Sequence, residues 1–138
     1  MGNSEVAVIV GAGQGLSAAL TRALTQQGTQ VVLAARDVSK LSALVADTGA
    51  RAVACDAGKP EEVAALFADV DGSEGAPDLV VFNPSRRVPG PLIDLDPGEV
   101  AAALTTSAFG MGKFALRPWV ENFDRVTKGH FSIQRLSK

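Results

Sequence analysis

The chain has 138 residues, a usual size for one domain, which can bury about two thirds of the surface that its unfolded form exposes. Hydrophobic residues make up 46% and charged residues 20%, a balance typical of a soluble globular protein rather than a disordered or fibrous one. The formal net charge is -2 and no basic block occurs that would neutralise a run of phosphates, so nucleic acid is not expected as a partner.

The cysteine content and the length of the apolar runs limit the cellular location and the kinds of metal or redox site that we expect. Cys55 is the only cysteine, which rules out an intramolecular disulfide, a zinc cluster and a Cys-x-x-Cys redox motif. No metal site is expected, and a reducing cytoplasm is the predicted location. The longest apolar runs, such as Val6 to Val10 and Val31 to Ala35, are far below the roughly 20 residues that span a bilayer, so no membrane partner is predicted.

In chain order, short β-branched runs alternate with longer segments whose apolar residues recur every three to four positions. That alternation predicts βαβ units and a parallel sheet. Gly28 and Gly49 are expected to end two helices, because glycine readily adopts the conformation that terminates a helix. The first half contains predicted strands at residues 5–10, 30–35 and 51–54, separated by predicted helices at 16–27 and near 38–47.

The second half continues the same alternation. Pro60 opens a predicted helix, a strand is predicted at 79–82, and a further helix begins near Asp96, which suits the capping position. Gly and Pro prevent regular pairing in two intervening stretches, so loops are predicted at 71–78 and 84–97.

A glycine-rich loop directly follows the first predicted strand and opens the first predicted helix. A phosphate resting there would meet unpaired N–H groups and the positive end of the helix dipole. A side chain at Gly15 would fill the space that a pyrophosphate needs, and we expect it to demand an unfavourable backbone angle. The loop is thus a predicted dinucleotide cradle, or else a turn that binds nothing. Its predicted binding residues are Gly11, Gly13, Gln14, Gly15 and Leu16.

The end of the second predicted strand bears on which nucleotide binds. An NAD-binding unit of this kind carries an acidic residue there, about 20 positions after the loop, for the ribose hydroxyls. Here that position is Ala35, and next to it stands Arg36, whose planar guanidinium suits a 2′-phosphate. NADP(H) is therefore predicted over NAD(H) as the cofactor. The alternative is an ordinary exposed arginine paired with Asp37.

These motifs, in this order, resemble the short-chain dehydrogenase/reductase family. Gly11 and Gly15 match the family's Gly-x-x-x-Gly-x-Gly loop, with Ser17 in place of the third glycine. The resemblance implies that Asp56 accepts a hydrogen bond from the adenine amino group and that Asn83 lines the cofactor ribose. As alternatives, Asp56 forms a local cap or turn, and Asn83 begins a turn before a proline.

The resemblance extends from Glu5 to about Gly110 and implies the family's fold. The fold class is α/β, a Rossmann-like doubly wound parallel sheet, incomplete here, with about four to five strands in an order that begins 3-2-1-4. A Rossmann-type NADP(H)-binding domain is predicted over residues 1–117. The pattern degrades beyond it, so residues 118–138 form a predicted irregular segment, in which 129–133 would suit a fifth strand.

The family's catalytic residues are a tyrosine that exchanges a proton with the substrate, a lysine four residues later and a serine that polarises the carbonyl. The chain contains no tyrosine. In one alignment, which skips a strand, Phe109 takes the tyrosine position and Lys113 either holds the ribose or is a solvated helix lysine. In the other the order is continuous, Ser107 replaces an asparagine that supports the proton relay, and the chain stops before the catalytic segment.

The leading hypothesis is an NADP(H)-binding relative of this oxidoreductase family. Hydride transfer between the cofactor and a carbonyl or alcohol is implied by resemblance, with incomplete catalytic machinery in this chain. One alternative is a non-catalytic module that senses NADP(H) or pairs with a full-length relative. Another is a truncated reading frame whose C-terminal segment does not fold natively. Besides the dinucleotide, the family suggests a small carbonyl substrate and a second copy of the chain as partners.

Overall fold

Four parallel strands form the centre of the protein. The computed structural model describes residues 4–109, and in that part of the chain the sheet has the order β3-β2-β1-β4. The predicted α/β fold and its 3-2-1-4 order are confirmed. The strands are β1 (Val6–Val10), β2 (Gln30–Ala35), β3 (Arg51–Ala54) and β4 (Leu79–Phe82).

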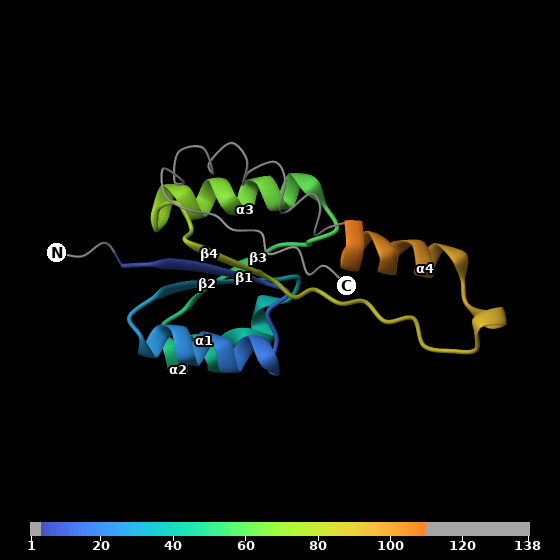
Figure 1. Ribbon diagram of the computed structural model, residues 1–138, viewed down its shortest axis with the longest axis horizontal. Coiled ribbons are helices and arrows are strands. Elements are labelled where there is room, and N and C mark those ends of the chain that lie inside the picture. The colour runs from blue at the N-terminus through green and yellow to red at the C-terminus, as the bar shows by residue number, and fades with distance from the viewer. Residues whose placement is uncertain (1–3, 110–138) are drawn as a thin grey trace, which may run out of the picture.

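Helices cover both faces of the sheet (Figure 1). One face carries α1 (Leu16–Gln26) and α2 (Ser42–Thr48), and the other carries α3 (Pro60–Ser73). A fourth helix, α4 (Pro97–Leu104), lies beyond the ends of the strands, on an arm that the chain forms after β4. Among residues 4–109, no helix combines the length and the apolar character needed to cross a bilayer.

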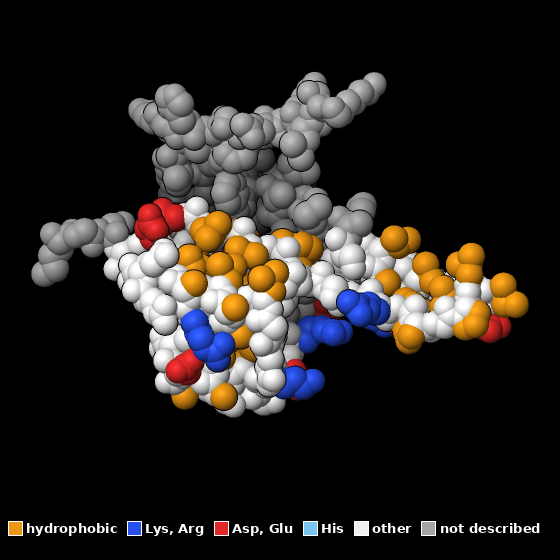
Figure 2. Space-filling view, turned by 60° about the horizontal axis from the view of Figure 1, so that its bottom comes forward, with side chains coloured by type: hydrophobic (Ala, Val, Ile, Leu, Met, Phe, Trp, Pro, Cys, Tyr) orange, Lys and Arg blue, Asp and Glu red, His pale blue; other side chains and the backbone are white. Residues whose placement is uncertain are grey.

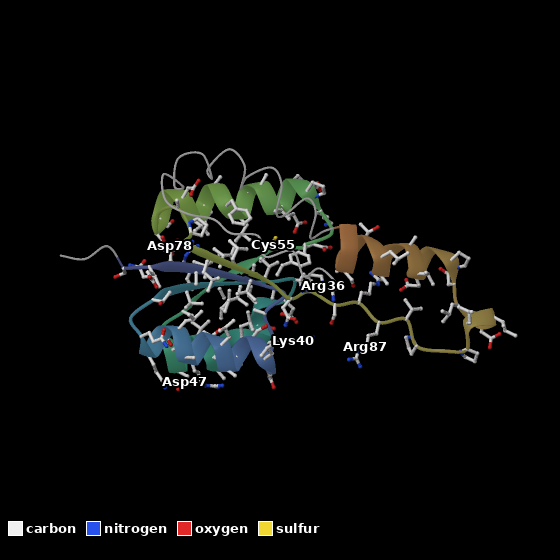
Figure 3. The ribbon with its side chains drawn as sticks, in the orientation of Figure 1. Arg36, Lys40, Asp47, Cys55, Asp78 and Arg87 are labelled. Carbon is white, nitrogen blue, oxygen red and sulfur yellow. The ribbon has the colours of Figure 1, made fainter. Side chains whose placement is uncertain are left out.

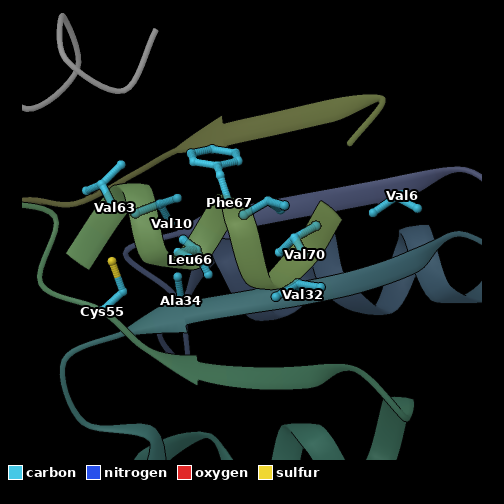
Figure 4. Close-up of a cluster of buried hydrophobic side chains, with 10 residues drawn as sticks. Val6, Val10, Val32, Ala34, Cys55, Val63, Leu66, Phe67 and Val70 are labelled. Carbon is cyan, nitrogen blue, oxygen red and sulfur yellow. The ribbon is translucent and has the colours of Figure 1, made fainter. Parts of the chain in front are cut away.

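The five residues of β1 are all buried, and they alternate between two cores. Val6, Val8 and Val10 face α3, whereas Ala7 and Ile9 belong to the cluster beneath α1 and α2. Figure 4 shows the α3 side of the sheet, where one stripe of the helix packs onto β1 and β2. That stripe has the helical spacing of three to four residues and consists of Val63, Leu66, Phe67 and Val70.

The predicted strands at 30–35, 51–54 and 79–82 agree with the structure, and β1 begins one residue later than predicted. The predicted helix near 38–47 is two elements, a 3₁₀ turn (Val38–Leu41) followed by α2. The predicted 84–97 loop contains a short 3₁₀ turn (Leu92–Asp94). The division at residue 117, the fifth strand at 129–133 and Lys113 lie outside the described residues.

The predicted loop at 71–78 is wrong in its first three residues, because α3 continues to Ser73. Val70 is fully buried and fixes the last turn of the helix against the sheet. Directly beyond it, the Glu74 carboxylate accepts two hydrogen bonds from Arg51 of β3, at 2.6 and 2.7 Å. Arg51 also donates to Asp69 at 2.6 Å. These contacts hold the end of the helix although the local sequence favours a loop.

Leu66 tests how far the core depends on α3. Its side chain is only 2% exposed, so Leu66→Ala removes buried methyl groups and leaves a cavity. We expect the free energy of unfolding of the full chain to fall by about 2–5 kcal/mol, measured by urea denaturation. Leu92→Ala is the matched control, because Leu92 is 84% exposed and its truncation should change stability by less than about 0.5 kcal/mol. Equal losses in both variants would contradict the assignment of the core.

Candidate functional site

A cavity of about 760 Å³ opens at the carboxyl ends of the strands. Its walls come from the glycine loop, the segments after β2, β3 and β4, and the end of α4 with the turn that follows it. In parallel α/β sheets this is the edge where ligands bind, next to the strand at which the strand order reverses. All eight residues predicted to bind a cofactor line this cavity: Gly11, Gly13, Gln14, Gly15, Leu16, Arg36, Asp56 and Asn83.

Gly11 fastens the glycine loop to the sheet. Its N–H donates to the carbonyl of Ala34 at 2.9 Å, and its φ of +76° lies in the left-handed region that favours glycine. A Cβ atom placed on Gly11 would lie 2.4 Å from the backbone nitrogen of Pro84, in the loop that follows β4. Gly11 is therefore required by the close approach of two backbone segments.

Gly15 lies at the entrance of α1. Its φ is -87° and its ψ is -122°, whereas the positive φ of this loop occurs at Gly11. A Cβ atom on Gly13 or Gly15 would meet no atom of residues 4–109 within 4 Å. The space beside these glycines is open to the cavity. Helix α1, which Gly15 precedes, has neither a side-chain cap nor an acidic residue in its first turn, so its positive end remains available to an anion.

Ser17 joins the glycine loop to the loop after β4. The side chain is buried, its hydroxyl donates to the carbonyl of Gly11 at 3.4 Å, and it accepts a hydrogen bond from the Asn83 side-chain amide at 3.2 Å. The backbone N–H of Asn83 donates to the carbonyl of Val10 at 2.9 Å. The serine that replaces the family's third glycine thus makes a bridge that the sequence did not reveal.

Arg36 and its neighbours form the rim of the cavity at the end of β2, as Figure 3 shows for Arg36 and Lys40. The predicted alternative was an exposed arginine paired with Asp37; Arg36 is exposed, but the pairing with Asp37 is wrong. Asp37 instead caps the 3₁₀ turn, accepting hydrogen bonds from the N–H and hydroxyl of Ser39, and these bonds lower the pKa of Asp37. Among residues 4–109, Arg36 has no hydrogen bond or ion pair.

Asp56 makes the turn after β3 and faces the cavity at the same time. Its Oδ1 atom accepts a hydrogen bond from the N–H of Gly58 at 2.9 Å, so the predicted local turn is confirmed. None of the described residues donates to its second carboxylate oxygen. Neighbouring Cys55 is buried, and this burial, together with Glu62 and Asp56, raises the pKa of its thiol to about 11. The thiol is therefore protonated near neutral pH and unsuited to nucleophilic chemistry.

The far wall of the cavity comes from α4 and a π-helical turn (Thr105–Phe109) that continues it. Thr105 and Thr106 line the cavity, and neither was predicted, because local sequence patterns do not tell which loop a distant helix meets. Arg86, after β4, also lines the cavity and forms an ion pair with Glu99 of α4 at 2.6 Å. This pair ties the arm to the loop after β4. No group of three metal-ligating side chains occurs within residues 4–109.

The sheet order and the glycine loop at its carboxyl edge define a Rossmann-like domain. A family model described as enoyl-(acyl carrier protein) reductase matches residues 11–117. Among solved structures, a metagenomic short-chain oxidoreductase in complex with NADP shares 32% identity and superposes with a TM-score of 0.76, over 82% of this chain and 54% of that one. The chain belongs to the short-chain dehydrogenase/reductase family.

Curated relatives lead to the same family. An uncharacterized oxidoreductase of Mycobacterium tuberculosis is 36% identical over 115 residues, which cover 80% of this chain and 43% of that protein. The farnesol dehydrogenase of Aedes aegypti is 30% identical over 133 residues, which cover 91% of this chain and 54% of that protein. The chain thus spans about half the length of these relatives.

The farnesol dehydrogenase comparison also bears on the two alignments of the C-terminal part. Its 133 aligned residues include 91% of this chain, which leaves room for a few unmatched residues but not for a whole missing strand and helix. This favours the continuous alignment, in which Ser107 lies on the helix after β4, where the structure has the turn that continues α4.

Gly11 provides a test of how the loops are packed. Gly11→Ala adds a Cβ atom that overlaps Pro84 and places it at a positive φ, so we expect a loss of more than about 2 kcal/mol in the free energy of unfolding. In Gly13→Ala the added atom has no neighbour within 4 Å in the described part of the chain, and the change should stay within about 0.5 kcal/mol. Both are measured by urea denaturation without nucleotide. A tolerated Gly11→Ala would show that the two loops are further apart.

Proposed function

We propose that the chain binds NADP(H), with the 2′-phosphate of the cofactor at Arg36. The observation that carries the proposal is the guanidinium at the cavity rim, which is unpaired among the described residues and follows Ala35, where an NAD-binding unit has a carboxylate. The carboxylate of Asp37 caps the 3₁₀ turn through its Oδ1 atom, which accepts both hydrogen bonds from Ser39, and its Oδ2 atom lies 3.8 Å from Lys40 Nζ. Arg36 offers a charge-assisted, forked contact that only a phosphorylated ribose uses.

The remaining cavity fits the other parts of such a cofactor. The open space beside Gly13 and Gly15, at the uncapped end of α1, suits a pyrophosphate. The second carboxylate oxygen of Asp56, which accepts no hydrogen bond within residues 4–109, suits the adenine amino group, and Asn83 lines the cavity, where the family resemblance assigns it to the ribose. When bound, the cofactor supplies a hydride at its nicotinamide ring.

Relatives support the choice of cofactor. The metagenomic oxidoreductase is a complex with NADP, and a variant of the actinorhodin polyketide ketoreductase, with 25% identity and a TM-score of 0.81, is a complex with NADPH. These two chains are longer, since the matched part covers 54% and 49% of them. We therefore assign cofactor binding to this chain. We assign oxidoreduction of a carbonyl or alcohol to a protein that combines this cofactor-binding part with a proton donor.

The chain itself has no tyrosine to act as that donor. Hydride transfer to a carbonyl carbon leaves an alkoxide that must take up a proton, and a positioned acid typically speeds such a step by about 10²–10⁴-fold. The second candidate function is hence a non-catalytic module, which senses NADP(H) or pairs with a full-length relative. The absent tyrosine favours it for this chain alone.

The preference for NADPH over NADH tests the proposal directly. Arg36→Ala should remove most of the preference, on the order of tenfold or more, since hydrogen bonds to charged groups contribute about 1.5–3 kcal/mol. The measurement is calorimetric titration of the unmodified chain and the variant with each nucleotide.

Arg22→Ala is the control for this titration. Arg22 forms an ion pair with Asp47 on the surface and does not line the cavity, so its loss removes the same charge elsewhere. It should leave the preference unchanged. Equal affinities of the unmodified chain for NADPH and NADH would refute the assignment of Arg36.

Catalysis by the purified chain is a separate test. We expect no NADPH oxidation with simple ketones or aldehydes above the background of host reductases, because no tyrosine is present. Phe109→Tyr should leave this result unchanged if the continuous alignment holds, and should raise the rate if Phe109 occupies the tyrosine position. Robust turnover by the unmodified chain would falsify the incomplete-site hypothesis.

A further inference from the structure

A second cation lies on the cavity rim next to Arg36. Lys40 lines the same cavity and comes from the last turn of the 3₁₀ helix that Asp37 caps. In Figure 3, Arg36 and Lys40 lie on the side of the sheet from which the chain leaves for α4, whereas Asp47 and Asp78 lie toward the opposite end. Figure 2 shows several Lys and Arg side chains around the notch between the body of the protein and its arm.

The ion pair between Asp37 and Lys40 is long and exposed. The Lys40 Nζ atom is 3.8 Å from the Asp37 Oδ2 atom, and the Lys40 side chain is 76% exposed. The pair between Arg22 and Asp47, by comparison, has a separation of 2.8 Å. The lysine side chain is flexible, and its separation from Asp37 is near the longest distance that still counts as an ion pair. Moving its ammonium group to a more highly charged anion therefore costs little free energy.

Asp37 places a negative charge close to the proposed phosphate site. Hydrogen bonds from Ser39 favour its charged form, so a carboxylate lies one residue from the guanidinium that would receive the phosphate. With Arg36 alone, the attraction for the phosphate is offset by this like charge. With Lys40 included, the rim of three charged side chains has a net positive charge and attracts a phosphate dianion.

We propose that Lys40 is a specificity-determining residue, which exchanges its contact with Asp37 for the 2′-phosphate and so supports the NADPH preference. The inference rests on the proposed function, because it concerns the phosphate assigned to Arg36. The inference adds a second contact to the phosphate, because Lys40 strengthens binding of the phosphorylated nucleotide. It also gives Asp37 an opposing effect, because Asp37 competes with the phosphate for the ammonium group.

Two variants test the exchange in opposite directions. Lys40→Met keeps most of the stem and removes the charge, and it should lower the ratio of NADPH to NADH affinity about threefold, as expected for an exposed charge pair. Asp37→Asn keeps a side chain that caps helices well and frees the lysine, so the same ratio should rise about twofold. NADH affinity should stay the same in both variants.

The matched controls come from the surface ion pair between Arg22 and Asp47. Arg22→Met and Asp47→Asn change the same charges at a pair outside the cavity and should leave the ratio unchanged. Adenosine 2′,5′-bisphosphate and adenosine 5′-monophosphate are titrated in parallel, because they differ only in the 2′-phosphate. At about 1 M salt, where the Debye length is about 3 Å, both effects should shrink.

The outcomes separate this inference from the proposed function. If Arg36→Ala abolishes the preference but Lys40→Met leaves it intact, the role of Lys40 is refuted and that of Arg36 stands. A drop in NADH affinity as large as that in NADPH affinity would also overturn it, because a loss common to both nucleotides is structural. If the unmodified chain shows no preference, both proposals fail together.

Discussion

Enclosure of β1 on all sides is the constraint on which the rest of the structure depends. No residue from Val6 to Val10 is more than 3% exposed, because β2 and β4 pair with its edges and helices cover its faces. The chain runs from β1 through β2 to β3 on one side, and then crosses to β4 on the other. The loops that leave β1 and β4 meet beside this reversal of the strand order, and the cavity opens at the same edge of the sheet.

Much of the fold followed from local pattern, because strands enclosed in a parallel sheet are near-continuous apolar runs with glycine or polar residues at their ends. The segment 30–35 is such a run, and its bounds were predicted as observed. The end of α3 was not predictable in this way. Gly72 and Ser73 favour a loop locally, but burial of Val70 and the contact of Glu74 with a strand about twenty residues earlier in the chain decide the outcome.

The candidate site was likewise predictable only where local sequence pattern determines it. The glycine loop and Arg36 were identified because their meaning depends on position after a strand, which the sequence pattern reveals. The hydrogen bond between Ser17 and Asn83 links residues far apart in sequence, and no local pattern predicts it. The wrong pairing of Arg36 with Asp37 has a similar cause, since adjacency in sequence suggested a contact, whereas the capping geometry turns the carboxylate toward Ser39.

The cavity has walls drawn from nearly the whole described chain, from Gly11 to Thr106. No short fragment presents it, so a nucleotide that binds there recognises only the folded protein. Such a ligand raises the free energy of unfolding by about 2.7 kcal/mol at a hundred times its dissociation constant. Because proteolysis acts on opened forms of a chain, a ligand bound in this cavity would also slow cleavage of the segments that line it.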